Sequence, residues 1–161
     1  MQEWYQSRAL YEAISKLISN RDFKTAVQVA ETIPDKGIKA KALSKITVEM
    51  ARLGEDYQDI LKKTLDSIFE MGRDDSITKA LMSLAFEFLN LDLIDDALKI
   101  ASMIKDVSSR SKIQAEVAIA LAKKGKIPEA LKIINDILDD DVKTWATSRL
   151  AAGLNQRREE D

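Results

Sequence analysis

The chain has 161 residues with 25 basic and 27 acidic side chains, a net charge of −2, and neither cysteine nor histidine. The missing residue types exclude disulfides, thiol nucleophiles, imidazole bases and metal sites built from Cys and His, and the small net charge gives no overall basic field for nucleic acid. The longest apolar run, Val117–Ala122, is far shorter than the ~18 residues of a candidate membrane span. The N-terminal residues lack the apolar run of a signal peptide. We therefore expect a cytoplasmic protein that binds neither membranes nor nucleic acid.

Apolar residues recur at helical spacing along the whole chain. Between Leu81 and Phe88, for example, they stand at i, i+3, i+4 and i+7, which is one face of an amphipathic helix. In chain order the pattern predicts nine helices, at residues 2–20, 22–33, 36–53, 56–71, 75–91, 93–105, 107–124, 127–139 and 141–157. Gly54 and Gly125 are expected to end helices, and Pro128 to begin one. Aspartates at the expected helix starts are candidate N-caps: Asp35, Asp74, Asp75, Asp106 and Asp139–Asp141.

The predicted helices repeat in pairs. The stretch GKIPEALKI, which begins at Gly125, matches DLIDDALKI, which begins 33 residues earlier at Asp92. The triplet KAL occurs at Lys41 and again 38 residues later at Lys79. A recurring period predicts stacked repeats that bury one another's apolar faces. We therefore expect an all-α fold, an α-solenoid of four antiparallel helix hairpins plus a C-terminal single helix, that forms one domain over residues 1–161.

The repeat resembles the tetratricopeptide-type (TPR-like) helical repeat over residues 8–154. Ala26, Ala97 and Ala130 stand where that family has a small residue in the second helix of each pair. The segment Gly54–Tyr57, GEDY, is similar to the family's link of glycine, aspartate and an aromatic residue. The resemblance implies a concave surface, lined by the first helix of each pair, that binds a peptide or a partner protein.

The first helices have a second apolar row beside their packing positions. The repeat alignment places this row on the concave side, where it would form a groove for a peptide or a partner helix. Packing against neighbouring helices is the alternative. The candidate groove residues are Tyr11, Val48, Met82, Phe86, Leu89 and Ile119.

One repeat position is basic in four consecutive helix pairs. It predicts a basic edge that receives an acidic tail, a phosphopeptide or a terminal carboxylate, while ion pairs with cap acids, such as Asp75 with Lys79, are the alternative. The basic edge consists of Arg8, Lys41, Lys79 and Lys112. Trp145 takes this position in the last helix. Two interpretations stay open for it: the ring folds back against Val142, or it mediates a homodimer through the C-terminal end.

The sequence predicts no catalytic, cofactor-binding or metal-binding residue. Glu49 and Glu87 are equivalent in the repeat, but solvated charges explain them better than a metal site or an acid–base pair. No glycine-rich phosphate loop occurs. We therefore expect a scaffold or adaptor, not an enzyme, that needs no cofactor and binds a protein or peptide partner. A regulatory subunit of an enzyme complex and a self-assembling structural module are the alternatives.

Overall fold

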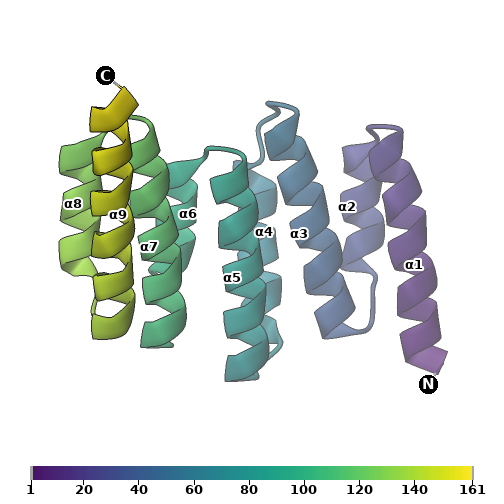
Figure 1. Cartoon of the computed structure of the whole chain (residues 1–161). Coiled ribbons are helices and arrows are strands. Elements are labelled where there is room, and N and C mark those ends of the chain that lie inside the picture. The colour runs from purple at the N-terminus through teal and green to yellow at the C-terminus, as the bar shows by residue number, and fades with distance from the viewer. Residues whose placement is uncertain (1, 161) are drawn as a thin grey trace. The chain divides into compact units, whose positions relative to one another are not determined.

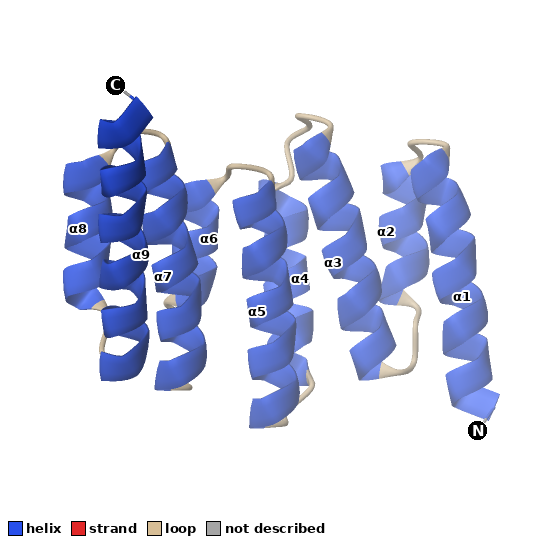
Figure 2. Ribbon diagram, in the orientation of Figure 1, coloured by secondary structure: helices blue, strands red, loops and turns tan. Residues whose placement is uncertain are grey.

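A computed structural model describes the backbone of residues 2–160 and the side chains as far as residue 155. Over these residues the chain forms nine α-helices and no strand (Figure 1; Figure 2). The helices are α1 (Gln2–Ser19), α2 (Phe23–Glu31), α3 (Lys36–Arg52), α4 (Gln58–Glu70), α5 (Asp74–Asn90), α6 (Ile94–Ala101), α7 (Val107–Lys123), α8 (Ile127–Asp136) and α9 (Asp140–Glu160). The predicted all-α fold with nine helices is confirmed for this part of the chain.

The chain divides into two compact units, residues 1–80 and 81–161, with the boundary inside α5. In the first unit α3 packs against α1, α2 and α4, and α1 packs against α2. In the second unit α7 packs against α6, α8 and α9, and α8 also contacts α9. First helices of successive pairs are therefore neighbours within a unit, α1 with α3 and α7 with α9. The single domain and the solenoid arrangement stay predictions.

Each unit has its own apolar core. In the first, a cluster of buried side chains from α1, α2 and α3 includes Ile14, Phe23 and Ile46. In the second, Phe88 and Val117 are fully buried. The small residues of the second helices are fully buried as well: Ala26, Ala97 and Ala130. Since helix interiors pack without voids, a larger side chain at these positions would force the paired helices apart.

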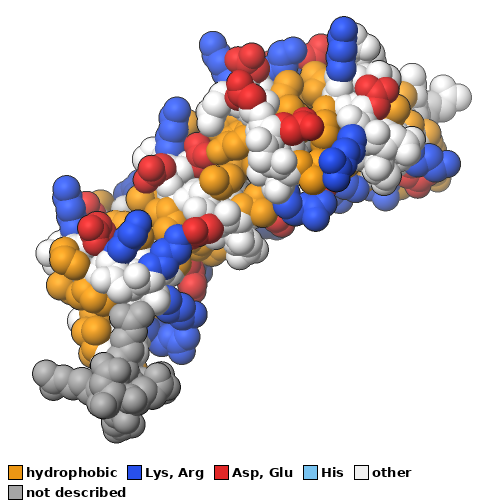
Figure 3. Space-filling view, turned by 90° about the horizontal axis from the view of Figure 1, so that it is seen from above, with side chains coloured by type: hydrophobic (Ala, Val, Ile, Leu, Met, Phe, Trp, Pro, Cys, Tyr) orange, Lys and Arg blue, Asp and Glu red, His pale blue; other side chains and the backbone are white. Residues whose placement is uncertain are grey.

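The links from first to second helices share one backbone conformation. Each contains a residue with positive φ: Arg21 (60°), Gly54 (74°), Asp92 (65°) and Gly125 (82°). The N–H of the following residue bonds to a carbonyl five positions back, at 2.9–3.0 Å: Asp22 to Leu17, Glu55 to Met50, Leu93 to Phe88 and Lys126 to Leu121. These are Schellman motifs, and they confirm that Gly54 and Gly125 end helices. Within each unit the links lie at the upper end of the helices in Figure 1, the end onto which Figure 3 looks.

Three of the four first helices that follow a second helix begin with a capping aspartate. The Oδ atoms of Asp35, Asp106 and Asp139 accept hydrogen bonds from the backbone N–H three residues later, at 2.8, 2.9 and 3.1 Å. These predicted caps are confirmed. In the remaining first helix, α5, Asp74 and Asp75 lie within the first turn, where a negative charge complements the helix dipole.

The second helices end earlier than the sequence predicts. The last residues of α2, α6 and α8 are Glu31, Ala101 and Asp136, so the predicted ends at residues 33, 105 and 139 are wrong. Three buried isoleucines lie just beyond these ends: Ile33, Ile104 and Ile137. Their N–H groups bond to carbonyls three residues back at 3.0–3.2 Å, so a tight turn brings each side chain into the core. The apolar period thus continues past the helix itself.

Candidate partner-binding sites

The first candidate site is a cluster of three cations around one aromatic ring on α1 and α3. The Cζ of Arg8 lies 5.7 Å from the centroid of the Tyr11 ring. The Nζ atoms of Lys41 and Lys45 lie 5.3 and 5.4 Å from the same centroid. We call these four residues the Tyr11 site. It unites one predicted groove residue, Tyr11, with two residues of the predicted basic edge, Arg8 and Lys41.

Helical spacing within each helix and the contact between the two helices produce this cluster. Arg8 and Tyr11 are three residues apart on α1, and Lys41 and Lys45 are four apart on α3, so each pair shares one face. Because α1 packs against α3, the two faces meet. Lys45 is absent from the predicted basic edge, which takes one basic position from each repeat. The i, i+4 spacing from Lys41 is the signal that could have revealed it.

The cations of the Tyr11 site have neutral partners within the described chain: besides the ring, the Ser15 hydroxyl accepts a hydrogen bond of 3.0 Å from the Nζ of Lys45. Within 4.0 Å, none of the three forms an ion pair with a side chain in the described part of the chain. Since each lies within 6 Å of the same ring centroid, no two of them are more than about 11 Å apart. This is comparable with the screening length of about 10 Å in 0.1 M salt, so they repel one another. Attraction of each cation to the face of the tyrosine ring opposes this repulsion.

Two further aromatic rings adjoin the Tyr11 site on the first turns of α1. Trp4 and Tyr5 are 50% and 62% exposed, and their rings meet edge to face with centroids 5.0 Å apart. Arg8 lies between Trp4 and Tyr11, with its Cζ 6.0 Å from the centroid of the Trp4 ring. Apolar contact area is therefore available next to the three cations.

The predicted basic edge has two further residues. Lys79 on α5 and Lys112 on α7 are exposed. The proposed pairing of Lys79 with Asp75 is absent, and Asp75 lies instead 3.8 Å from the Nε of Arg73. The positive charge of Lys112 acts on Asp106. Hydrogen bonds from the Ser109 hydroxyl and N–H chiefly hold the pKa of Asp106 below its ordinary value, and the charge of Lys112 lowers it further.

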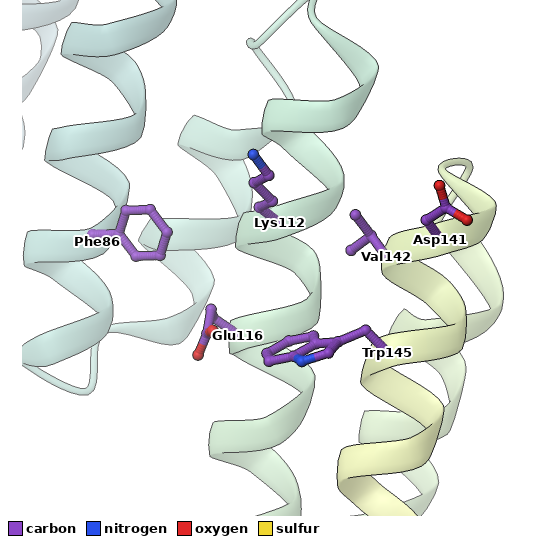
Figure 4. Close-up of a pocket in the computed structure, with 6 residues that line it drawn as sticks. All are labelled: Phe86, Lys112, Glu116, Asp141, Val142 and Trp145. Atoms are coloured by element: carbon purple, nitrogen blue, oxygen red, sulfur yellow. The ribbon is translucent and has the colours of Figure 1, made fainter.

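The second candidate site is an open cavity of about 410 Å³ in the second unit. Six residues from α5, α7 and α9 line it: Phe86, Lys112, Glu116, Asp141, Val142 and Trp145. The Trp145 ring extends from α9 toward α7, and Phe86 reaches toward the cavity from α5 (Figure 4). Trp145 remains 45% exposed. The homodimer through Trp145 stays a prediction, as does the ring's packing against Val142.

The remaining predicted groove residues are half-buried or buried. Val48 on α3 is half-buried, as are Met82 and Leu89 on α5. Ile119 is 9% exposed and belongs to the packed interior of the second unit. On α7 the second apolar row therefore packs inward at this position, which was the alternative interpretation of the row.

Neither a metal centre nor a membrane span emerges from the described residues. No group of three or more Asp and Glu side chains in that part of the chain is arranged to hold a metal ion. None of the helices between residues 2 and 160 combines the length and the apolar character needed to cross a bilayer. Glu49, one of the two carboxylates considered for acid–base chemistry, forms an ion pair with Arg52 one turn later on α3.

No family model matches the chain, and neither a curated protein nor a solved structure matches it.

Proposed function

We propose that this protein is a non-catalytic adaptor of the tetratricopeptide-like kind that binds an acidic segment of a partner protein at the Tyr11 site. The observation that supports it most directly is the position of Arg8, Lys41 and Lys45 around one ring, with no ion-pair partner for any of them among the described residues.

A bound carboxylate would lower the free energy of this cluster in two ways. It replaces repulsion among the three cations by attraction, and it accepts charge-assisted hydrogen bonds, each typically contributing about 1.5–3 kcal/mol. The exposed rings of Trp4 and Tyr5 offer contact to an apolar residue next to the acid in the partner. The best ligand is therefore a short segment that combines carboxylates with an apolar or aromatic side chain.

A protein segment suits this site better than a nucleic acid. Nucleic-acid affinity grows with the number of phosphates neutralised, and the Tyr11 site offers three cations. Both basic and acidic side chains lie on the face shown in Figure 3. The net charge of −2 also disfavours a polyanion.

The test is a titration of the purified chain into fluorescein-labelled pentaglutamate, with pentaglutamine as the neutral counterpart and labelled oligothymidylate as the nucleic-acid arm. We expect binding of pentaglutamate only, measured by fluorescence anisotropy. Charge reversal by Lys41→Glu with Lys45→Glu should weaken binding at least ~10-fold, which corresponds to about 1.4 kcal/mol.

A matched control separates the local site from the total charge. Lys99→Glu with Lys132→Glu changes the net charge equally, at exposed positions on α6 and α8. This double variant should retain affinity within about 2-fold, because neither lysine belongs to the Tyr11 site. Equal losses in both double variants, or binding of oligothymidylate in preference to pentaglutamate, would contradict the proposal.

The two alternatives predict different partners. A regulatory subunit would bind an enzyme and change its activity, whereas a self-assembling module would bind its own chain. Analytical ultracentrifugation of the purified protein distinguishes self-assembly, since a self-assembling module forms species larger than the homodimer predicted through Trp145.

A further inference from the structure

The cavity in the second unit contains a carboxylate between two aromatic rings. Glu116 projects from α7, with the Phe86 ring of α5 on one side and the Trp145 ring of α9 on the other (Figure 4). Glu116 is half-buried and forms no ion pair within 4.0 Å with any described side chain. The charge between the two aromatic rings is thus negative here, whereas the charges around the ring of the Tyr11 site are positive.

The side chains that line this cavity include more carboxylates than cations. Its lining includes two carboxylates, Glu116 and Asp141, and one ammonium group, that of Lys112. In Figure 4 the Lys112 ammonium points away from Glu116 and from the Trp145 ring. The pKa of Asp106, an acid that does not line the cavity, is lowered chiefly by hydrogen bonds from Ser109 and further by the positive charge of Lys112. Among the lining residues, Glu116 is therefore the charged group next to Phe86 and Trp145. The guanidinium of Arg149, which is not part of the lining, also lies near the indole ring.

We infer that this cavity binds an arginine side chain of a partner protein. The planar guanidinium stacks on the exposed indole ring of Trp145 and donates two parallel hydrogen bonds to the carboxylate of Glu116. The alkyl stem of the arginine packs against Phe86 and Val142. Lysine fits less well, because its compact ammonium group can neither stack on the ring nor bond to both carboxylate oxygens in one plane.

The Trp145 ring already contacts a guanidinium within the chain. The Cζ of Arg149, one turn later on α9, lies 5.8 Å from the centroid of the indole ring. Arg149 therefore contacts part of the ring, and a partner's guanidinium would stack on the part that is still exposed, since Trp145 is 45% exposed. The cavity volume of about 410 Å³ lies within the usual range for ligand sites, roughly 300–1,000 Å³, and the cavity opens to solvent.

This inference rests on different residues from the proposed function and can succeed or fail separately. The probe is the tripeptide acetyl-Leu-Arg-Leu-amide, compared with the same peptide containing citrulline, a neutral isostere of arginine, and with one containing glutamate. In a Trp4→Phe background Trp145 is the remaining tryptophan of the chain, so its fluorescence reports binding directly.

We expect the arginine peptide to bind at least ~10-fold more tightly than the citrulline peptide, and the glutamate peptide to bind more weakly than either. Glu116→Gln should remove the preference for arginine over citrulline, since it keeps the shape of the side chain and removes its charge. Lys112→Gln should increase arginine affinity. Glu129→Gln, at an exposed position on α8, is the matched control and should preserve the preference.

Several results would overturn the inference. They are equal binding of the arginine and citrulline peptides, a preference for the glutamate peptide, no response to millimolar arginine peptide, or an unchanged preference in Glu116→Gln. Circular dichroism confirms that each variant is folded, and Trp4→Phe with Phe86→Leu provides a second loss-of-contact variant if Glu116→Gln unfolds. The Lys41→Glu, Lys45→Glu chain should bind the arginine peptide normally, which separates this site from the Tyr11 site.

Discussion

The backbone N–H of Asp139 donates a hydrogen bond of 3.3 Å to the hydroxyl of Ser111, a fully buried residue on α7. Asp139 at the same time caps α9 through its own side chain. The bond thus joins the N-terminal end of one first helix to the preceding first helix. The first unit contains the same arrangement, in which Asp35 N–H donates to the fully buried Ser7 hydroxyl at 3.1 Å.

Removing this hydroxyl should destabilise the protein. Ser111→Ala leaves the partly buried N–H of Asp139 without an acceptor, and an unsatisfied donor of this kind costs about 1–3 kcal/mol. Urea denaturation followed by circular dichroism measures the loss of unfolding free energy. Ser83→Ala, at an exposed position on α5, is the control and should change stability by less than about 0.5 kcal/mol. Equal stability of the two variants would show that the buried bond contributes nothing.

The link glycines and the helix glycine should respond oppositely to the same substitution. Neither Gly54 nor Gly153 has an atom within 4 Å of an added Cβ, so neither alanine would clash. Gly54 has a φ of 74°, where an L-residue costs roughly 1–2 kcal/mol. Gly153 lies within α9, where alanine is favoured over glycine by about 1 kcal/mol. Gly54→Ala should therefore lower the thermal midpoint and Gly153→Ala should not; a shift in the same direction for both would be inconsistent with the link geometry.

The stability of the second unit should depend on the ionisation of Asp106. Hydrogen bonds from the Ser109 hydroxyl and N–H, aided by the charges of Lys112 and Arg110, lower its pKa below the ordinary value of 3.8. Because the pKa of Asp106 is lower in the folded chain than in the unfolded chain, the stabilisation is fully present above the unfolded pKa. It is lost as pH falls through the folded pKa. Asp106→Asn should therefore lose less unfolding free energy than wild type between about pH 5 and about pH 3.

The control for this pH dependence is Asp136→Asn. Asp136 is the last residue of α8, is exposed, and accepts no hydrogen bond from another described residue. Denaturant titrations at a series of pH values should give this variant the slope of the wild type. If Asp106→Asn also shows the wild-type slope, the capping hydrogen bonds do not distinguish the ionised from the neutral acid.

The ring at the centre of the Tyr11 site should hold its cations in place. Tyr11→Phe keeps the aromatic face and should bind pentaglutamate almost as the wild type does. Tyr11→Leu removes three cation–π contacts, each worth about 0.5–1 kcal/mol at exposed sites, and lets the cations spread apart. Fluorescence anisotropy should then report a loss of affinity of about 3- to 10-fold. Identical affinities of the phenylalanine and leucine variants would mean that the ring plays no part in arranging the charges.

Much of the fold follows from local chemistry that the sequence displays. Helical periodicity predicts nine helices. Glycines predict helix ends and aspartates predict helix starts, and the structure has these at Gly54 and Gly125 and at Asp35 and Asp106. Arg21 adopts the same left-handed conformation as the link glycines. Arginine has no preference for this conformation, so the sequence does not predict it there. The ends of α2, α6 and α8 were predicted too late, because the buried isoleucines after them continue the apolar period without continuing the helix.

The candidate sites were predictable only in part, because they depend on how helices approach one another. Periodicity places Arg8, Tyr11 and Lys41 on first helices, but their distances depend on the contact between α1 and α3. Lys45 enters the Tyr11 site through this contact. The cavity beside Trp145 likewise depends on where α9 packs against α7, which no pattern within either helix specifies.

The most direct test of the central claim is a nuclear magnetic resonance titration of the isotopically labelled chain with pentaglutamate. The account predicts that the largest changes in amide and side-chain resonances map to Arg8, Tyr11, Lys41 and Lys45, with smaller changes at the neighbouring Trp4, and that they disappear in the Lys41→Glu, Lys45→Glu variant. Changes that map mainly to residues 81–155, or that persist in this variant, would contradict binding of an acidic segment at the Tyr11 site.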